Sequence, residues 1–267
     1  GLDGNLTAAG GKYEGVGRAE AREKVVEELD RLGFLEKVEN HRHSVGHCQR
    51  CSSVVEPLVS LQWFVNLGGV NEPDSIAGKA HAAVAGGDIN IVPERFRRVY
   101  LNWLENIRDW CISRQLWWGH RIPVWYCAAC QYMTVTADDP ETCGSCGSEE
   151  IEQDADVLDT WFSSALWPLS TMGWPDPSNF PEEIPEGEAV LEKWNPSDCL
   201  STAREIITLW VSRMVMMNLY FRRCLPFRDV FIHAMIQDGQ GRKMSKSLGN
   251  GVDPLDIIHS HGADAMR

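Results

Sequence analysis

The chain has 267 residues, of which 43% are hydrophobic and 24% are charged, a globular composition with enough length for one large domain or two modest ones. Its formal net charge of −13 argues against a general nucleic-acid binder, because contacts to phosphate need lysine and arginine. The sequence has no apolar run approaching about 18 residues and no signal peptide at its N-terminus, which argues against a membrane or secreted protein and predicts a cytoplasmic one.

The first half of the chain predicts helices separated by loops, with one short strand. Apolar residues recur at helical spacing, and glycines stand where helices would end, at Gly33 and at Gly86. On this basis helices are predicted over residues 17–32, 75–85 and 103–110. The pattern at 54–57 indicates a strand, and the arginines at 95–98 are typical of a local basic loop.

A proline-rich stretch and a strong amphipathic helix come next. Residues 174–189 are rich in proline and acidic residues and are interpreted as a surface insertion. A helix is predicted over residues 202–220, with Thr202 and Glu205 as a capping box at its start. One face of this predicted helix carries Ile206, Trp210, Met214 and Met217.

The last part of the chain predicts an α/β unit. A β-rich run at 230–236 is expected to be buried in a parallel sheet. A loop rich in glycine and lysine follows at 237–251, and Asp253 with Pro254 then begins a helix. Strand, loop and helix in this order predict a doubly wound, Rossmann-like α/β fold.

The loop contains two lysines three residues apart. Residues 241–250 read GRKMSKSLGN, so that Lys243 and Lys246 lie between serines and glycines. A mobile cationic loop can close over a polyphosphate and supply positive charge where the transition state develops negative charge. A lysine pair at this spacing is more often part of a solvated basic turn, so the spacing alone does not favour the functional interpretation.

Residues 243–247 are identical to the KMSKS signature of the class I aminoacyl-tRNA synthetases, which the chain resembles from about residue 12 onwards. The resemblance implies that Lys243 and Lys246 stabilise the triphosphate of ATP, with Mg²⁺, while an amino-acid carboxylate attacks the α-phosphate and pyrophosphate leaves. Lys246 would be the more important of the two. Ser245 and His233 would lie beside the nucleotide, although a buried structural histidine is an equally good interpretation of His233.

Two further motifs are similar to those of the valine-specific enzymes of this class: WCISRQLWWGHRIP at 110–123 and DTWFSSALWP at 159–168. The resemblance implies that Trp161, Ile206 and Trp210 line the slot for the valine side chain. Ile206 and Trp210 are four residues apart and would meet on one face of the predicted helix. Ordinary core packing is the alternative, since the chain has 11 tryptophans.

Glu205 marks a departure from the family pattern. A Gly-x-Asp sequence usually stands at this position, close to the ribose of the adenylate, whereas this chain has Ala203-Arg204-Glu205. Glu205 could accept hydrogen bonds from the ribose with a longer side chain, or it could act as the acid of the capping box. Both interpretations remain open from the sequence.

Two Cys-x-x-Cys pairs, separated by twelve residues, predict a metal site. Each pair can occupy two corners of a tetrahedron, so Cys127, Cys130, Cys143 and Cys146 together would close a structural Zn²⁺ site in a small knuckle over residues 127–146. The alternative is four free thiols. Because the ligand set is complete, the metal would hold the knuckle together and take no part in catalysis.

A third pair, Cys48 and Cys51, has no second pair in this chain. His43 and His47 could complete a site with it. The family resemblance favours another arrangement, in which this pair is half of a metal site completed by cysteines from the first half of the catalytic domain. The remaining cysteines are interpreted as core or bystander thiols.

The resemblance divides the chain into residues 1–40, expected to be the end of an editing domain, and 41–267, expected to be the second half of the class I catalytic domain. Neither the His-Ile-Gly-His-type motif of the first half nor the anticodon-binding domain is present in these residues, so the chain is expected to be a fragment that is inactive alone. The missing N-terminal half would be a partner of this chain.

The expected function is therefore ATP-dependent activation of valine and its transfer to tRNA(Val). An isoleucine-specific synthetase and a non-catalytic zinc-binding module are the alternatives.

Overall fold

The computed structural model describes residues 1, 3–48, 51–55, 57, 59–176, 190–245 and 248–267. The chain separates into two compact units, Gly1–Ser60 and Leu61–Arg267. Among the described residues, no helix is long and apolar enough to span a membrane.

The first unit contains a 3-10 helix, η1 (Ala8–Tyr13), and one long helix, α1 (Arg18–Arg31). The predicted helix at 17–32 is confirmed, and Gly33 follows it with a φ of 73°, a left-handed conformation that suits glycine at a helix end. The predicted strand at 54–57 does not form in the described residues, where Val54 makes an isolated bridge to His47. Glu56 lies outside the described residues.

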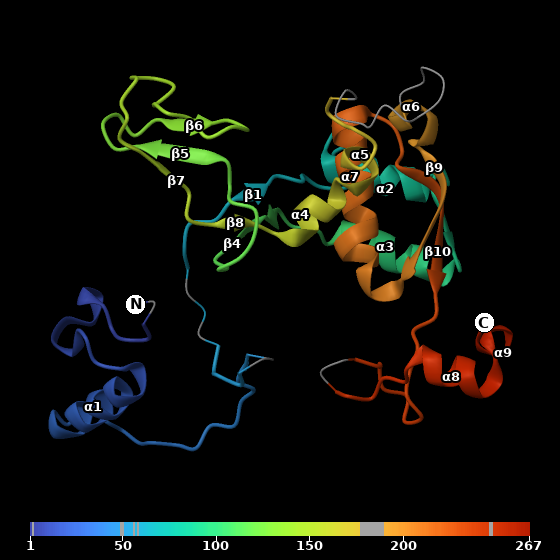
Figure 1. The fold of residues 1–267 in the computed structure, drawn as a ribbon. Helices are drawn as coiled ribbons and strands as arrows, with labels where there is room; N and C mark the ends of the chain where they lie inside the picture. The colour runs from blue at the N-terminus through green and yellow to red at the C-terminus, as the bar shows by residue number, and fades with distance from the viewer. Residues whose placement is uncertain (2, 49–50, 56, 58, 177–189, 246–247) are drawn as a thin grey trace. The chain divides into compact units, whose positions relative to one another are not determined.

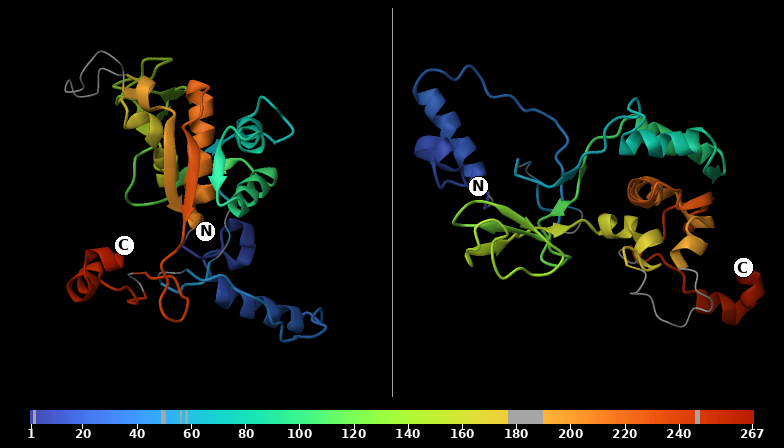
Figure 2. Two further views of the ribbon diagram at one scale, coloured as in Figure 1. Left: turned by 90° about the vertical axis from the view of Figure 1, so that its right-hand side faces the viewer. Right: turned by 90° about the horizontal axis from the view of Figure 1, so that it is seen from above.

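Three parallel strands organise the second unit. Strands β2 (Asn90–Val92), β10 (Phe227–His233) and β9 (Ser197–Ala203) are hydrogen-bonded in that order, with Val230 of the central strand beside Ile91 and Leu200. The three strands lie side by side in Figure 2. This arrangement confirms the predicted α/β fold with a parallel sheet.

The central strand is buried on one face. Val230 and Ile232 are buried, whereas Phe231 is 50% exposed and His233 is exposed. The prediction of a buried run over 230–236 is therefore wrong in two respects: the strand begins and ends three residues earlier, and its side chains alternate between core and surface. The apolar sequence alone did not distinguish one covered face from two.

Helices cover the buried face of the sheet (Figure 1). The main ones are α2 (Ile76–Ala85), α3 (Arg95–Glu105) and α7 (Ser212–Arg222). Ser75 caps α2 by accepting a hydrogen bond from Gly78 N at 2.9 Å, as the predicted helix at 75–85 requires. Their buried side chains form one core with those of the sheet; the largest fully buried members include Tyr100, Leu104, Met214 and Met216.

Two predicted elements are displaced in the structure. The helix predicted at 103–110 is α3, which begins at Arg95, so the arginines at 95–98 lie in its first turn and not in a loop. The side of α3 that packs on the core carries Phe96, Tyr100 and Leu104, which are four residues apart. This apolar spacing is visible in the sequence and could have predicted the helix from Arg95. Trp110 instead belongs to strand β3 (Trp110–Cys111).

The helix predicted at 202–220 is in fact four elements. Thr202 lies in β9, and the chain then passes through a 3-10 turn, η3 (Arg204–Ile206), and a π-helical turn, η4 (Ile207–Val211), before α7 begins. The predicted capping box does not form, because Thr202 is a buried strand residue and no side chain caps η3. π-helical turns are rare and concentrate at functional sites.

The remaining strands form small antiparallel sheets: β1 (Phe64–Val65) with β3, β4 (Ser113–Arg114) with β8 (Val157–Leu158), and β6 (Met133–Val135) with β5 (Val124–Cys127) and β7 (Ile151–Gln153). The remaining helices are α4 (Thr160–Ala165), α5 (Trp167–Ser170), α6 (Val190–Trp194), α8 (Pro254–His261) and α9 (Ala263–Met266). Of the predicted surface insertion, residues 177–189 lie outside the described residues.

Candidate functional site

A cavity of about 670 Å³ opens at the carboxyl ends of β9 and β10. This end of a parallel sheet is where doubly wound folds bind their ligands. Ala203, the last residue of β9, and His233, the last of β10, line the cavity together with Ser245 of the lysine loop, residues 237–251. Most of the other lining side chains are apolar: Met235, Ile236, Met244, Val252, Pro254 and Ile257.

The helix that bounds this cavity begins as predicted. Asp253 caps α8, since its side chain accepts a hydrogen bond from Leu255 N at 2.9 Å, and Pro254 occupies the first helical position. The lysine loop is thus joined to the sheet by β10 and to α8 by a fixed cap.

Asp238 and Asn250 tie the two ends of the lysine loop together. Asn250 Nδ2 donates to Asp238 Oδ2 at 2.8 Å and to the Lys243 carbonyl at 3.2 Å, and Asn250 Oδ1 accepts from Ser245 N at 2.9 Å. The carboxylate of Asp238 also accepts from the backbone and side chain of Arg242. These hydrogen bonds, that from Asn250 foremost, hold the pKa of Asp238 below its ordinary value.

Neither Asp238 nor Asn250 was identified from the sequence. A signal for Asp238 was available, because Asp-Gly followed by a polar residue is typical of a turn in which the aspartate accepts from the backbone two residues on. Asp238 Oδ1 does accept from Gln240 N at 3.0 Å.

The structure brings Lys243 to Glu205. Lys243 Nζ lies 3.5 Å from Glu205 Oε1. Glu205, two residues after the end of β9, is thus paired with the lysine loop. Both side chains are more than a third exposed, and such a pair contributes little to stability by itself. Its significance is positional, because it places a carboxylate next to the cavity-lining end of β9. Lys246 lies outside the described residues.

His233 is exposed, which contradicts the alternative of a buried structural histidine. Its Nδ1 lies 2.9 Å from the Ala234 carbonyl, and the residue lines the cavity. If the ring donates this hydrogen bond from Nδ1, its other nitrogen is free to accept one.

The three residues predicted to form an amino-acid slot lie on neighbouring elements. Trp161 is on α4, and the indole Nε1 of Trp210 donates to Ser164 O on the same helix at 3.0 Å. Trp161 and Trp210 are both half-buried against the core, and neither they nor Ile206 line the 670 Å³ cavity. Because Ile206 and Trp210 lie in different turns, their predicted i, i+4 helical relation is wrong.

The four cysteines of the predicted knuckle converge. Within the part of the chain that the structure describes, Cys127, Cys130, Cys143 and Cys146 are the one group of three or more metal-ligating side chains, with their sulfurs within 4.8 Å of one another. Two cross pairs, Cys127–Cys146 and Cys130–Cys143, have Sγ–Sγ distances of 3.6 Å. Zinc–sulfur bonds of about 2.3 Å in a tetrahedron require sulfurs about 3.8 Å apart.

The backbone of the knuckle also suits a metal. The residue after each Cys-x-x-Cys pair, Gln131 or Gly147, has a positive φ, and its N–H donates to the carbonyl of the first cysteine of the pair. Backbone N–H groups of Cys146 and then Ser145 lower the pKa of the Cys143 thiol to about 6. The backbone hydrogen bond at Tyr132 lowers the pKa of the Cys130 thiol, but hydrogen bonds with neighbouring cysteine sulfurs, that of Cys146 foremost, outweigh it and raise that pKa to about 12. The donor set therefore fits a closed, structural metal site.

The first-unit pair, Cys48 and Cys51, gains no such set. Cys51 Sγ donates to Ser53 Oγ at 3.3 Å, and His47 Nδ1 lies 2.8 Å from Ser52 O. In the described residues neither His43 nor His47 completes a metal-ligating group with this pair.

Residues 16–267 match the family of tRNA synthetases class I (I, L, M and V). The chain belongs to the class I tRNA synthetases. The valine–tRNA ligase of Thermotoga maritima is 54% identical to 97% of this chain, and that of Symbiobacterium thermophilum is 52% identical to 100% of it. The chain spans 28% of the length of each of these relatives.

A solved class I synthetase shares the fold. The methionyl-tRNA synthetase of Mycobacterium tuberculosis bound by methionyl-adenylate superposes with a TM-score of 0.54 and 19% identity, covering 83% of this chain and 35% of that protein. The parallel sheet and the helices on its covered face are therefore those of a class I synthetase catalytic domain.

Proposed function

We propose that the complete protein activates valine with ATP and transfers it to tRNA(Val). In the first step the valine carboxylate attacks the α-phosphate of ATP, forming valyl-adenylate and releasing pyrophosphate. In the second, a hydroxyl of the terminal adenosine of the tRNA attacks the acyl carbon, and AMP leaves. The single observation that carries the proposal is the lysine loop, which borders a cavity at the carboxyl ends of two parallel strands.

In this proposal the lysines act on the departing charge. Lys243 and Lys246 neutralise the triphosphate of ATP, which enters with Mg²⁺, as negative charge moves onto pyrophosphate. Preorganised charges of this kind accelerate the reaction because they bind the transition state more strongly than the substrates. Ser245 and His233 contact the nucleotide from the cavity wall, and Glu205 accepts hydrogen bonds from its ribose.

Trp161, Ile206 and Trp210 form the slot for the valine side chain. The proposal is supported by the hydrogen bond that ties the Trp210 indole to the helix carrying Trp161, which places two rigid aromatic groups on adjoining elements. Branched aliphatic side chains gain free energy from burial against such apolar walls. Valine–tRNA ligases among the relatives favour valine over isoleucine as the occupant.

The four-cysteine cluster binds Zn²⁺ with a structural role, and the metal's chemistry there is to hold four thiolates. Cys48 and Cys51 form half of a second site, completed by cysteines of the first half of the catalytic domain.

Residues 1–40 are the end of an editing domain, and residues 41–267 belong to the second half of the catalytic domain. The protein acts in the cytoplasm.

Amino-acid-dependent exchange of pyrophosphate into ATP by the complete protein tests the proposal. We expect exchange with valine, and at least tenfold less efficient exchange with isoleucine, since about 1–3 kcal/mol of discrimination is what one methylene gives in an apolar pocket. Exchange with isoleucine as the better substrate would replace this proposal by the isoleucine-specific alternative.

A lysine substitution separates an enzyme from a non-catalytic zinc module. We expect Lys246→Ala in the complete protein to lower kcat for exchange by about 100-fold or more, with little change in the KM for valine, because its charge acts on the transition state. The control is Lys193→Ala on α6, away from the cavity lining. An unchanged kcat for Lys246→Ala would support the non-catalytic alternative.

A further inference from the structure

The amino-acid slot is bordered by a buried carboxylate, Asp159. Its side chain is 9% exposed. Asp159 does not line the cavity, and its described partners are not in the lysine loop. It immediately precedes α4, the short helix on which Trp161 stands. A buried carboxylate is retained against a large desolvation penalty, so its surroundings should show what holds it.

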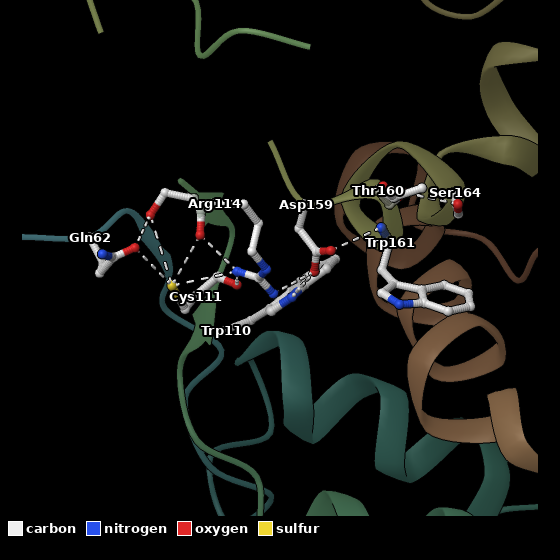
Figure 3. A network of polar contacts seen from close by, with 9 residues as sticks. Gln62, Trp110, Cys111, Arg114, Asp159, Thr160, Trp161 and Ser164 are labelled. Carbon is white, nitrogen blue, oxygen red and sulfur yellow. Dashed lines mark hydrogen bonds and ion pairs between the residues drawn. The ribbon is translucent and has the colours of Figure 1, made fainter. Parts of the chain in front are cut away.

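Asp159 joins the start of α4 to two neighbours, Arg114 and Trp110. Oδ1 caps the helix by accepting from Trp161 N at 3.3 Å, while Oδ2 accepts from Arg114 Nη2 at 2.9 Å and from Trp110 Nε1 at 3.4 Å. Figure 3 shows the carboxylate between the Arg114 guanidinium and the backbone amide of Trp161. One oxygen thus holds the helix, and the other is fixed by β3 and β4.

Arg114 is itself held in place. Its Nη1 donates to the backbone carbonyls of Cys111 and Ser113 at 3.0 Å and 2.8 Å, which leaves Nη2 directed at Asp159. Ser113 in turn donates to Gln62 Oε1 at 2.8 Å. Both terminal nitrogens of the guanidinium therefore make hydrogen bonds, and Arg114 connects the small sheet of β4 to the cap of α4.

A second arginine adds charge on the same side. The guanidinium of Arg213 on α7 lies 4.0 Å from the ring centre of Trp110 and 4.8 Å from that of Trp103. Burial lowers its pKa to about 10 and the charge of Asp159 opposes that change, so Arg213 stays protonated at neutral pH. Trp110 is thus fixed by Arg213 on its face and by Asp159 at its indole nitrogen.

We propose that Asp159, held by Arg114, is a positioning residue that sets the location of Trp161 and thereby the width of the amino-acid slot. The inference rests on the proposed role of Trp161 in binding valine. Asp159 touches no reacting atom. It acts because an α4 of six residues has little stability of its own, so its first turn depends on the cap.

The test is a set of substitutions in the complete protein, read out as the KM for valine, the KM for ATP and the preference for valine over isoleucine. Asp159→Asn keeps an oxygen that can cap α4 but removes the charge opposite Arg114. We expect it to raise the KM for valine about tenfold, the usual effect of losing a hydrogen bond between charged groups, with the KM for ATP within about twofold. The preference for valine should fall by a similar factor, because a displaced indole excludes isoleucine less well.

Two further variants guard against simple unfolding. Arg114→Lys keeps the positive charge but replaces the planar guanidinium, with its two terminal nitrogens, by a single ammonium group. It should give the same changes to a smaller degree. Glu192→Gln is the matched control, since Glu192 Oε1 of α6 also pairs with an arginine, Arg222 Nη2 of α7, at 2.8 Å. It should leave all three quantities unchanged.

Equal losses for valine and ATP, or an unchanged preference for valine in both Asp159→Asn and Arg114→Lys, would overturn the inference. A wild-type protein that activates another amino acid would overturn the proposed function instead. The same variants would then report on the slot through the KM for that amino acid.

Discussion

Glu205 shows how one residue can differ from its family and still keep a place in the site. Its carboxylate lies 3.5 Å from Lys243 Nζ and two residues beyond Ala203, which lines the cavity. A glutamate has one more methylene than the aspartate usual at this position, and the 3-10 turn of η3 displaces its backbone from a regular helix. In the proposed function, this longer side chain lets the carboxylate of Glu205 accept hydrogen bonds from the ribose of ATP.

Substitution of Glu205 tests this role. We expect Glu205→Ala in the complete protein to raise the KM for ATP about tenfold, because a hydrogen bond from a hydroxyl to a carboxylate contributes about 1.5 kcal/mol. The KM for valine should not change. The measurement is the ATP dependence of pyrophosphate exchange. The control is Glu149→Ala, since Glu149 is an exposed residue just after the knuckle. An unchanged KM for ATP in Glu205→Ala would assign Glu205 to the pair with Lys243 alone.

At the scale of an element, the lysine loop has a base held by side-chain hydrogen bonds. Asn250 makes three hydrogen bonds across the base, to Asp238, to the Lys243 carbonyl and from Ser245 N. Several glycines in and after the loop, such as Gly241 and Gly249, have positive φ values that other residues rarely adopt. A fixed base with glycine hinges is what a loop needs if its lysines are to close on a ligand reproducibly.

Loss of Asn250 should therefore loosen the loop without altering the slot. We expect Asn250→Ala to lower kcat for exchange about tenfold, since misplaced charges stabilise the transition state less, while the KM for valine stays the same. Amide exchange at Ser245 should become faster, because its N–H loses its acceptor. If the amide hydrogen of Ser245 exchanged at the wild-type rate in Asn250→Ala, the loop would not depend on the hydrogen bonds of Asn250.

The elements also show what the sequence could and could not predict. The helix at 75–85, the cap at Asp253 and the parallel strand all followed from local patterns, because capping and helical spacing are decided within a few residues. The start of α7 did not follow. Thr202 and Glu205 match a capping box, yet Thr202 is drawn into β9 by its pairing beside Ile232, a contact between residues thirty positions apart.

The candidate site divides in the same way. Signatures with a fixed spacing identified the cysteines Cys127, Cys130, Cys143 and Cys146, which converge, and the KMSKS segment, of which Met244 and Ser245 line the cavity. The pair Cys48 and Cys51 gains no further ligand in the described residues. Asp159, Arg114 and Asp238 were missed, because their roles come from partners that the fold supplies. A carboxylate cannot be recognised as a helix cap held by an arginine 45 positions away until the fold brings the two together.

At the scale of the whole molecule, the cysteine cluster gives a prediction that does not depend on catalysis. We expect Cys143→Ser to lower the zinc content of the complete protein by about one ion per molecule, since a structural site needs its full tetrahedral set. Metal release measured with a colorimetric chelator checks this. Cys199→Ser is the matched control, because Cys199 is an exposed thiol on β9 outside the cluster and should leave the metal in place. Equal zinc content in both variants would exclude the cluster as the metal site.

Two exposed apolar surfaces, one on the sheet of the second unit and one on α1 of the first, give the last prediction. In the described residues Phe231 of the central strand is 50% exposed, and on α1 the side chains of Val25, Val26 and Leu29 are 37–38% exposed. Apolar surfaces of this kind are normally covered in the folded state. Since the chain spans 28% of its valine–tRNA ligase relatives, the parts of the protein that lie outside these residues can supply the cover.

We therefore expect residues 1–267 produced alone to bind a hydrophobic dye and to show no valine-dependent pyrophosphate exchange, while the complete protein shows exchange and little dye binding. The reason is physical: three strands and one layer of helices provide one wall of a nucleotide site, and a transition state with charge on several phosphate oxygens needs groups on more than one side. Steady exchange by the isolated 267 residues would show that the lysine loop and the cavity beside it suffice.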